Sequence, residues 1–256
     1  MVVAGMYEKN EMPRKAQLPE NHTYKDMSRD QFMCRRRLHR TANADDNNDT
    51  RFLFYPGRGL QGSRFWHMGS NEWRNIGIVR DRDILFQSVE NYNLLSNHPS
   101  FASCFKDIDF LETPTFGEQV IVEGCDTSQL AVGDIFEVEG GLSTLVVQVS
   151  GPRLPSFYLD YSHGSPTGMK GIKRYCMTHG LAGWFARVLT YGELRDGMRL
   201  VRKQHPNPKW TIPFISKSLY GEGDKKELMM CKAHWVRSKK ELIELISIPE
   251  LMRFQW

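Results

Sequence analysis

Short runs of β-forming residues, each followed by glycine or proline, fill residues 51–202 of this 256-residue chain and limit the folds that it can adopt. Glycine and proline after such runs are typical of turns between strands. Many short strands with few helices are typical of a β-barrel and not of a parallel α/β sheet. We therefore predict a mainly β fold, a barrel with short helices. The predicted strands are Phe52–Tyr55, Ile76–Val79, Gln119–Val122, Ile135–Val138, Thr144–Val149, Phe185–Leu189 and Met198–Val201.

Helical patterns stand between and after these runs. Asp83–Leu95 and Lys170–His179 carry apolar residues at helical spacing, and Gly180 is suited to end the second helix. Ser238-Lys-Lys-Glu241 has the spacing of a capping box and begins a helix that Pro249 ends. The end of the chain is therefore predicted to be a helical tail.

The first fifty residues differ from the rest, because they are polar and hold few β-branched residues. Ser28-Arg-Asp-Gln31 has capping-box spacing and predicts a short helix through Phe32, Met33 and Leu38. Residues 41–50 are too polar to fold alone. We expect this region to dock on other structure. The predicted organisation is a polar, basic N-terminal extension (1–50), a barrel domain (51–220) and a C-terminal helical tail (221–256).

Composition narrows the functional classes. The net charge of +4 and the isoelectric point near 8.7 are compatible with a nucleic-acid partner but do not identify one. No apolar run approaches the roughly 20 residues that cross a bilayer, so we expect no membrane partner. The five cysteines include no CxxC pair, which predicts a reducing intracellular compartment, the cytoplasm or the mitochondrial matrix.

An arginine and a hydroxyl follow the predicted strand Thr144–Val149. The segment Gly151-Pro-Arg-Leu-Pro155 stops this strand, because its two prolines remove backbone donors and fix φ. Stiff loops at strand ends are common positions for binding and catalytic groups. We therefore predict a functional site around Arg153 and Ser156.

Segments spread over roughly residues 57–256 follow one family pattern in order. They are Gly59-Leu-Gln-Gly62, Glu90-Asn-Tyr92, Phe116-Gly-Glu-Gln-Val-Ile-Val-Glu-Gly124, Gly133-Asp-Ile-Phe136, Pro152-Arg153, Gly183-Trp184, Arg187-Val-Leu189 with Gly192, Pro206, Trp210-Thr-Ile212 and Ile248-Pro-Glu-Leu251. Together they resemble the MOSC family, the domain also found at the C-terminus of molybdenum cofactor sulfurases, and in particular its single-domain bacterial branch. The resemblance implies a MOSC-like β-barrel.

Departures from that pattern cluster at the site. Where the family has a cysteine, its sulfur carrier, this chain has Ser156. Ser63 and Met198 stand where the family has aspartate, and Trp66-His-Met-Gly-Ser70 replaces a His-Gly-Gly segment before Asp83. The scaffold glycines and aromatic residues are present. The resemblance therefore implies the family fold with a degenerate site.

The replacement of cysteine by Ser156 changes the chemistry that the loop can perform. A thiolate carries a persulfide or ligates molybdenum, whereas a hydroxyl does neither at neutral pH without a dedicated base. His163 is a candidate base, but no Gly-x-Ser-x-Gly elbow surrounds Ser156. A hydroxyl that bonds its own backbone is the simpler interpretation, so we name no catalytic residue.

Arg153, Arg187 and Glu118 are the candidate residues for an anion or cofactor site. Two arginines on neighbouring strands are suited to bidentate binding of a phosphate or carboxylate. The alternative is a structural ion pair of Arg153 with Glu118 or Glu123.

Cys176 and His179 have half of the spacing of a zinc site. A zinc site needs three or four ligands, and no second Cys/His pair stands nearby in the sequence. A helical stripe explains both residues as core, so we predict no metal site.

Arg35, Arg36, Arg37 and Arg40 form the strongest basic cluster and are candidates for nucleic-acid binding. The alternative is a solvated helix face, and the acidic run Asp45–Asp49 argues against a continuous basic strip. A second region combines aromatic rings able to stack on bases with further arginines. It consists of Arg64, Phe65, Trp66, Trp73, Arg74, Arg80 and Arg82, whose rings can equally be core aromatics.

These observations leave two interpretations. The preferred one is a catalytically degenerate MOSC protein without a cofactor. It would be a structural or binding subunit of a larger assembly, such as a mitochondrial ribosome or its assembly intermediate, with RNA or protein rather than DNA as its partner. The alternative is a molybdenum-cofactor-dependent enzyme or sulfur carrier, which the resemblance implies reduces N-hydroxylated compounds or transfers cofactor sulfur. There, Arg153 and Arg187 hold the phosphate of the cofactor, and Cys176 or Cys125 replaces the missing thiol.

Overall fold

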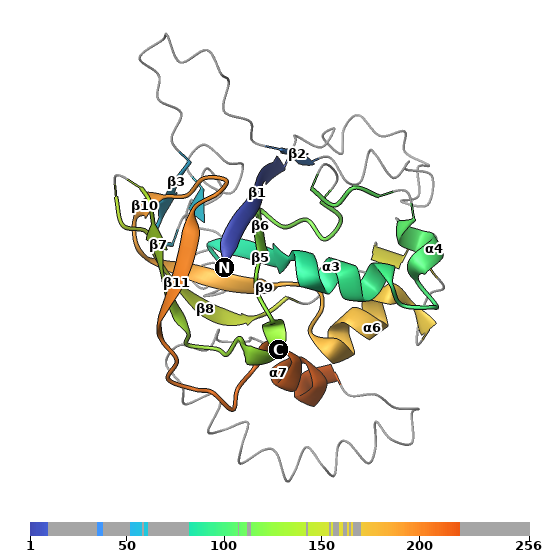
Figure 1. Cartoon of the computed structure of the whole chain (residues 1–256). Helices are drawn as coiled ribbons and strands as arrows, with labels where there is room; N and C mark the ends of the chain where they lie inside the picture. Colours follow the sequence, from blue (N-terminus) through green and yellow to red (C-terminus); the bar gives the residue numbers. More distant parts are fainter. Residues whose placement is uncertain are drawn as a thin grey trace, which may run out of the picture.

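The computed structural model (Figure 1) describes residues 1–9, 35–37, 52–57, 59–60, 82–106, 108–111, 114–141, 143–153, 155, 159–160, 163, 165 and 170–220. The predicted strand Ile76–Val79, the helix predicted from Ser238 and the first part of the helix predicted from Ser28 lie outside these residues. Within these ranges, no helix has both the length and the apolar character needed to span a membrane.

Strands of the described part close into a barrel, which confirms the predicted fold class. The barrel strands are β1 (Val2–Lys9), β5 (Ile84–Ser88), β6 (Val120–Glu123), β7 (Ile135–Glu139), β8 (Val146–Pro152), β9 (Trp184–Thr190) and β11 (Arg199–Gln204). Their order is β11-β7-β8-β9-β5-β6-β1, and β1 closes the barrel by pairing with β11. All neighbours are antiparallel except β5 and β6, which run parallel.

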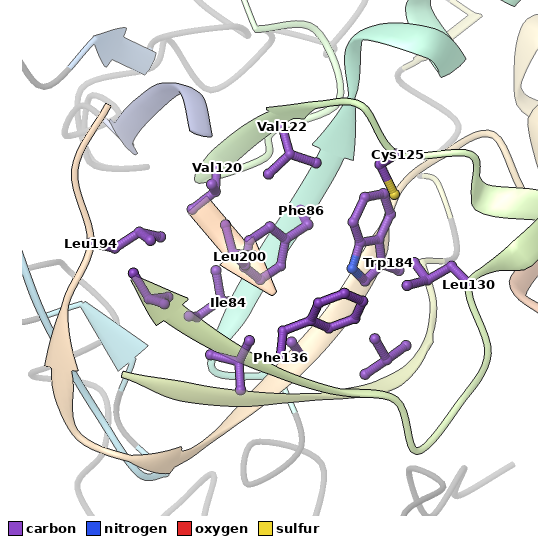
Figure 2. Packing of buried hydrophobic residues seen from close by; sticks show 14 of the residues in the cluster. Ile84, Phe86, Val120, Val122, Cys125, Leu130, Phe136, Trp184, Leu194 and Leu200 are labelled. Atoms are coloured by element: carbon purple, nitrogen blue, oxygen red, sulfur yellow. The ribbon is translucent and has the colours of Figure 1, made fainter. Parts of the chain in front are cut away.

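Alternating side chains fill the barrel. Along β9, Trp184, Ala186 and Val188 are buried, whereas Phe185 between them is partly exposed. Because successive side chains of a strand point to opposite faces, the buried set faces the interior. Figure 2 shows this interior, where the rings of Trp184 and Phe86 stack with their centroids 5.7 Å apart. The period-two pattern of the sequence therefore corresponds to the inside and outside of the barrel.

The first strand, β1, occupies part of the expected N-terminal extension. It pairs with β6, and the register shifts between Val3 and Gly5, which marks a β-bulge. Tyr7 is buried, and its hydroxyl donates to the carbonyl of Leu111 at 2.6 Å. The barrel therefore begins at residue 2 and not at residue 51. The apolar start of the chain supplies the closing strand, although the polar residues after it dominate the composition of residues 1–50.

The predicted helix Asp83–Leu95 is wrong in its first half. Ile84–Ser88 form strand β5, and helix α3 (Val89–Ser96) begins only after it. β5 is buried along its whole length and pairs with both β9 and β6, which outweighs the helical spacing of its apolar residues. Ser88 caps the helix, because its Oγ accepts the amide of Asn91 at 3.1 Å.

Short helices cover one side of the barrel (Figure 1). Helices α3, α4 (Ala102–Phe105) and α6 (Ile172–His179) share a hydrophobic cluster with Ile121 of β6. The helix predicted at Lys170–His179 is confirmed apart from its first two residues. Gly180 ends it in the left-handed conformation, at φ 70°. Helix α7 (Ile212–Tyr220) packs so close to this end that a side chain at Gly180 would clash with the backbone of Pro213.

A small antiparallel sheet lies beside the barrel (Figure 1). It contains β3 (Leu53–Tyr55), β4 (Gly59–Leu60) and β10 (Gly192–Glu193). Asp83 links it to the barrel, because its Oδ2 accepts the amides of Gly57 at 3.0 Å and of Val188 at 2.8 Å. The strand Phe52–Tyr55 is therefore correctly predicted but belongs to this second sheet.

A buried chain of hydrogen bonds joins β5, α3 and a short 3₁₀ helix, Thr127–Gln129. Gln87 Nε2 donates to the carbonyl of Leu181 at 2.9 Å, and Asn91 Nδ2 donates to Gln87 Oε1 at 2.8 Å. Thr127 Oγ1 donates to Asn91 Oδ1 at 3.0 Å. All of these side chains are buried, so Asn91 is the central link of a desolvated network.

We expect Asn91→Ala to lower the free energy of unfolding by roughly 2–3 kcal/mol, because Gln87 and Thr127 each lose a buried partner. Urea unfolding followed by circular dichroism measures this change. Asn93→Ala is the matched control, since Asn93 is exposed on the same helix and should change stability by less than about 0.5 kcal/mol. An equal loss in both variants would contradict the role of the network.

Candidate functional site

The candidate site is built on the end of strand β8. Pro152, the last residue of β8, lies opposite Trp184, and the amide of Arg153 donates to the carbonyl of Gly183 at 3.0 Å. Gly183 has φ 87°, and a side chain there would collide with the carbonyl of Phe86. Only glycine allows this approach. The backbone of Arg153 is therefore fixed at the edge of the barrel by two neighbouring strands.

The side chain of Arg153 is partly buried. Its Nη1 atom is buried and has no hydrogen-bond partner among the described residues, although the residue as a whole is partly exposed. Burial lowers the pKa of Arg153, and the negative charge of Glu118 is the largest influence in the opposite direction. None of the ion pairs between described residues includes Arg153, so the expected direct pair with Glu118 or Glu123 is not formed.

Glu118 is fully buried before strand β6 and is held by its neighbours. The hydroxyl of Tyr92, on α3, donates to Glu118 Oε1, and the amide of Phe116 donates to Glu118 Oε2 at 2.9 Å. The amide of Thr115 in turn donates to the Tyr92 hydroxyl at 3.0 Å. Burial and the charge of Glu118 raise the pKa of Tyr92. The sequence predicts Tyr92 only as a core residue, because it shares a helical stripe with apolar residues, so its contact with Glu118 is not predicted.

Two further groups belong to the helical layer around α6. Cys176 on α6 is buried, and burial raises the pKa of its thiol far above the ordinary value despite the positive charge of Arg153. Asp160 accepts the amide of Lys173 in the first turn of α6 at 2.8 Å, and burial raises its pKa. Asp160 was not predicted, because no local spacing connects it with a helix that begins twelve residues later.

Arg187 lies elsewhere on the barrel. It is opposite Gln148 on β8, and its Nε donates to Gln148 Oε1 at 2.8 Å. Arg153 is five residues farther along β8 and its loop than Gln148, which at about 3.3 Å per residue corresponds to roughly 17 Å. The register therefore separates the two arginines that we expected to bind one anion together, and only Arg153 remains at the site.

Ser156 lies outside the described residues. His163, its candidate base, is buried; its Nδ1 is 2.9 Å from the carbonyl of Leu159, and its ring packs against Phe105. These contacts explain His163 as a core residue.

The half-site spacing of Cys176 and His179 reflects their positions on α6. His179 Nδ1 is 2.9 Å from the carbonyl of Tyr175, and the two rings stack. No group of three or more potential metal ligands occurs in the part of the chain that the structure describes.

The basic cluster is not helical as predicted, because Arg35–Arg37 form a short strand, β2. Arg36 lies opposite Glu8 of β1 in the register. The backbone pairing with β1 therefore decides the conformation of this segment, and the local helical pattern does not. Arg40 lies outside the described residues, as does all of the second basic and aromatic region except Arg82. Arg82 is 5.1 Å from the ring centroid of Phe185.

The chain is similar to one curated protein in sequence and to solved structures in fold. A fungal protein named "Reductase", from Gibberella moniliformis (strain M3125 / FGSC 7600), is 29% identical over 104 residues. The match covers 41% of this chain but only 17% of the reductase, so it spans about a sixth of that protein. A crystal structure of a hypothetical protein has a TM-score of 0.56 at 19% identity, and covers 78% of this chain and 76% of its own.

YiiM from Geobacillus stearothermophilus is also similar, at 23% identity and a TM-score of 0.46, with 68% of this chain and 74% of YiiM covered. The model of the family described as "MOSC domain" matches residues 66–201, which are 136 of the 256 residues and thus more than half of the chain. This match includes β5 to β9, Arg153 and Glu118. The chain belongs to the MOSC domain family.

Proposed function

We propose that this chain binds the molybdenum cofactor through Arg153 as a component of a reductase. The association of the MOSC family with that cofactor supports the choice of ligand. The name of the fungal relative supports the class of reaction, although the match covers only part of that protein. This proposal follows the alternative interpretation of the sequence.

The buried Nη1 atom of Arg153 is the observation that carries the proposal. A buried donor without a partner costs about 1–3 kcal/mol of stability, and such a donor calls for an explanation. An oxyanion at this position would supply the missing acceptor through a charge-assisted hydrogen bond. The phosphate of the cofactor has this chemistry, so the anionic end of the cofactor fits the described residues.

The metal end of the cofactor does not fit the described cysteines. A protein thiol ligates molybdenum as the thiolate. Burial raises the pKa of Cys125 to about 12, and that of Cys176 is raised still more. Both thiols are buried, so neither presents an accessible thiolate in place of the thiol that Ser156 lacks. The proposal is therefore limited to binding of the cofactor, and we derive no reaction step at the metal.

The subunit interpretation has less support. The relative named "Reductase" is not described as a ribosomal or RNA-binding protein. Arg35–Arg37 lie in a strand opposite residues 7–9, which include Glu8. No observation at this strand points to RNA.

We expect Arg153→Gln to reduce the pterin that co-purifies with the chain by at least about tenfold, because the amide carries no charge for the phosphate. The full chain is expressed in a bacterium that makes the cofactor. Pterin is measured by fluorescence after oxidation, and molybdenum by mass spectrometry. Arg199→Gln is the matched control, since Arg199 is exposed on β11.

Equal pterin in the wild type and Arg153→Gln would contradict the proposal, as would a wild-type chain that carries RNA and no pterin. The absorbance ratio at 260 and 280 nm, followed by nuclease treatment, detects RNA in the same samples.

The thiols give a second test. At pH 8 the thiolate fraction of Cys125 is on the order of 10⁻⁴, which follows from a pKa about four units higher. We expect iodoacetamide to alkylate Cys104, which is partly exposed, much faster than Cys125 or Cys176. Peptide mapping by mass spectrometry separates the sites, and the urea-unfolded chain should show equal rates. Rapid alkylation of Cys176 in the folded chain would show that its thiol is accessible and would contradict this expectation.

Restoring the family cysteine gives a third test. We expect Ser156→Cys to raise the ratio of molybdenum to pterin in the purified chain, because a thiolate is a soft ligand for the metal. Ser156→Ala should leave the ratio unchanged. If both variants match the wild type, metal retention does not depend on this position.

A further inference from the structure

The pairing of β8 with β9 places an aromatic residue beside Arg153. Pro152 lies opposite Trp184 in the register, and the amide of Arg153 donates to the carbonyl of Gly183 at 3.0 Å, so Arg153 and Gly183 form the next pair. Phe185, two residues beyond Gly183, is therefore the diagonal neighbour of Arg153. Diagonal neighbours of an antiparallel pair lie about 7–8 Å apart, which is within reach of long and aromatic side chains.

Arg153 and Phe185 share the outer face of the barrel. Trp184 belongs to the barrel core, whereas Phe185 is partly exposed. Opposite residues of two paired strands share a face, and successive residues of a strand alternate between faces. Because Pro152 lies opposite Trp184, the residue after it, Arg153, lies on the outer face with Phe185.

A β-bulge in β8 gives Arg153 this direction. Val149 belongs to the barrel core, and strict alternation would turn Arg153, four positions later, to the same side. The register instead shifts between Val149 and Gly151, so that one residue is extra and the alternation changes. Bulges of this kind often re-aim a side chain beside a functional site.

The two positions that lie between Arg153 and Phe185 on this face are glycines. Gly151 lies opposite Phe185, and Gly183 pairs with Arg153, so neither position places a side chain between the arginine and the ring. Arg82 lies over the ring, 5.1 Å from its centroid, yet Phe185 keeps part of its surface exposed. The outer face here combines a buried charged donor with a partly accessible aromatic ring.

We propose that the ligand of this site is an organic phosphate with a planar ring: Arg153 binds its oxyanion, and Phe185 contacts its ring and determines specificity. This inference rests on the proposed function, because it assumes that an oxyanion binds at Arg153. It adds the chemical class of the group that is joined to the anion.

Titration of the purified full chain with two phosphate monoesters, by isothermal calorimetry, tests this inference. Methyl phosphate and phenyl phosphate carry the same anionic group, and only the second carries a ring. We expect the wild type to bind phenyl phosphate about fivefold more tightly than methyl phosphate, because two aromatic rings in contact gain affinity.

Substitutions of Phe185 separate contact with the ligand from a merely structural role. Phe185→Leu keeps an apolar side chain but has no ring, so we expect the preference to fall below about twofold while the affinity for methyl phosphate stays the same. Phe185→Tyr should keep the preference. Tyr191→Leu is the matched control and should also keep it, because this exposed tyrosine lies six residues after Phe185, about 20 Å along an extended chain.

Equal binding of the two esters by the wild type overturns the specificity for a ring and leaves the proposed function standing, and this outcome does not depend on the folding of any variant. A preference that survives in folded Phe185→Leu, including an equal loss of affinity for both esters, also overturns the inference. A wild type that binds neither ester, or equal binding by Arg153→Gln and the wild type, overturns both the inference and the proposed function.

Discussion

The backbone pairing of β5 with its two neighbours is the constraint on which the site depends. Phe86 lies opposite Trp184 of β9 and opposite Val120 of β6. Gly183, just before β9, approaches the carbonyl of Phe86 so closely that no side chain fits there. The carbonyl of Gly183 accepts the amide of Arg153, so the position of Arg153 is set through main-chain contacts that lead back to β5.

The parallel pairing of β5 with β6 explains where the buried acid Glu118 lies. Parallel strands cannot be joined by a tight turn, so the chain leaves β5 through α3 and α4 and returns over the outer face of the barrel. This route carries Tyr92 on α3 and ends at Glu118, immediately before β6. The crossover that covers the barrel with helices therefore also determines where the Tyr92–Glu118 pair lies.

The parts of this structure that the sequence could predict are those with a local cause. β9 and α6 were predicted correctly because the period of their buried residues lies within one element. The end of the strand before Arg153 was predicted from the two prolines, but β8 continues through Gly151 and Pro152, which pair with β9. β1 was missed, because its partners β6 and β11 are distant in sequence. The separation of Arg187 from Arg153 depends on the register of β8 and β9, and the link of Tyr92 to Glu118 on packing between a helix and a loop.

Arg153 and Ser156 differ in their effect on the stability of the fold, and therefore in what each indicates about function. A loop hydroxyl can bond its own backbone, so a serine at the family cysteine position carries no energetic penalty and reports only that a thiolate is absent. A buried guanidinium nitrogen without a partner lowers stability by about 1–3 kcal/mol, and an apolar residue of similar size would avoid this cost. The proposed anion binding depends on Arg153, whereas metal ligation depends on a thiolate. The two capacities are physically separable, so the absence of the thiol does not argue against the anion site.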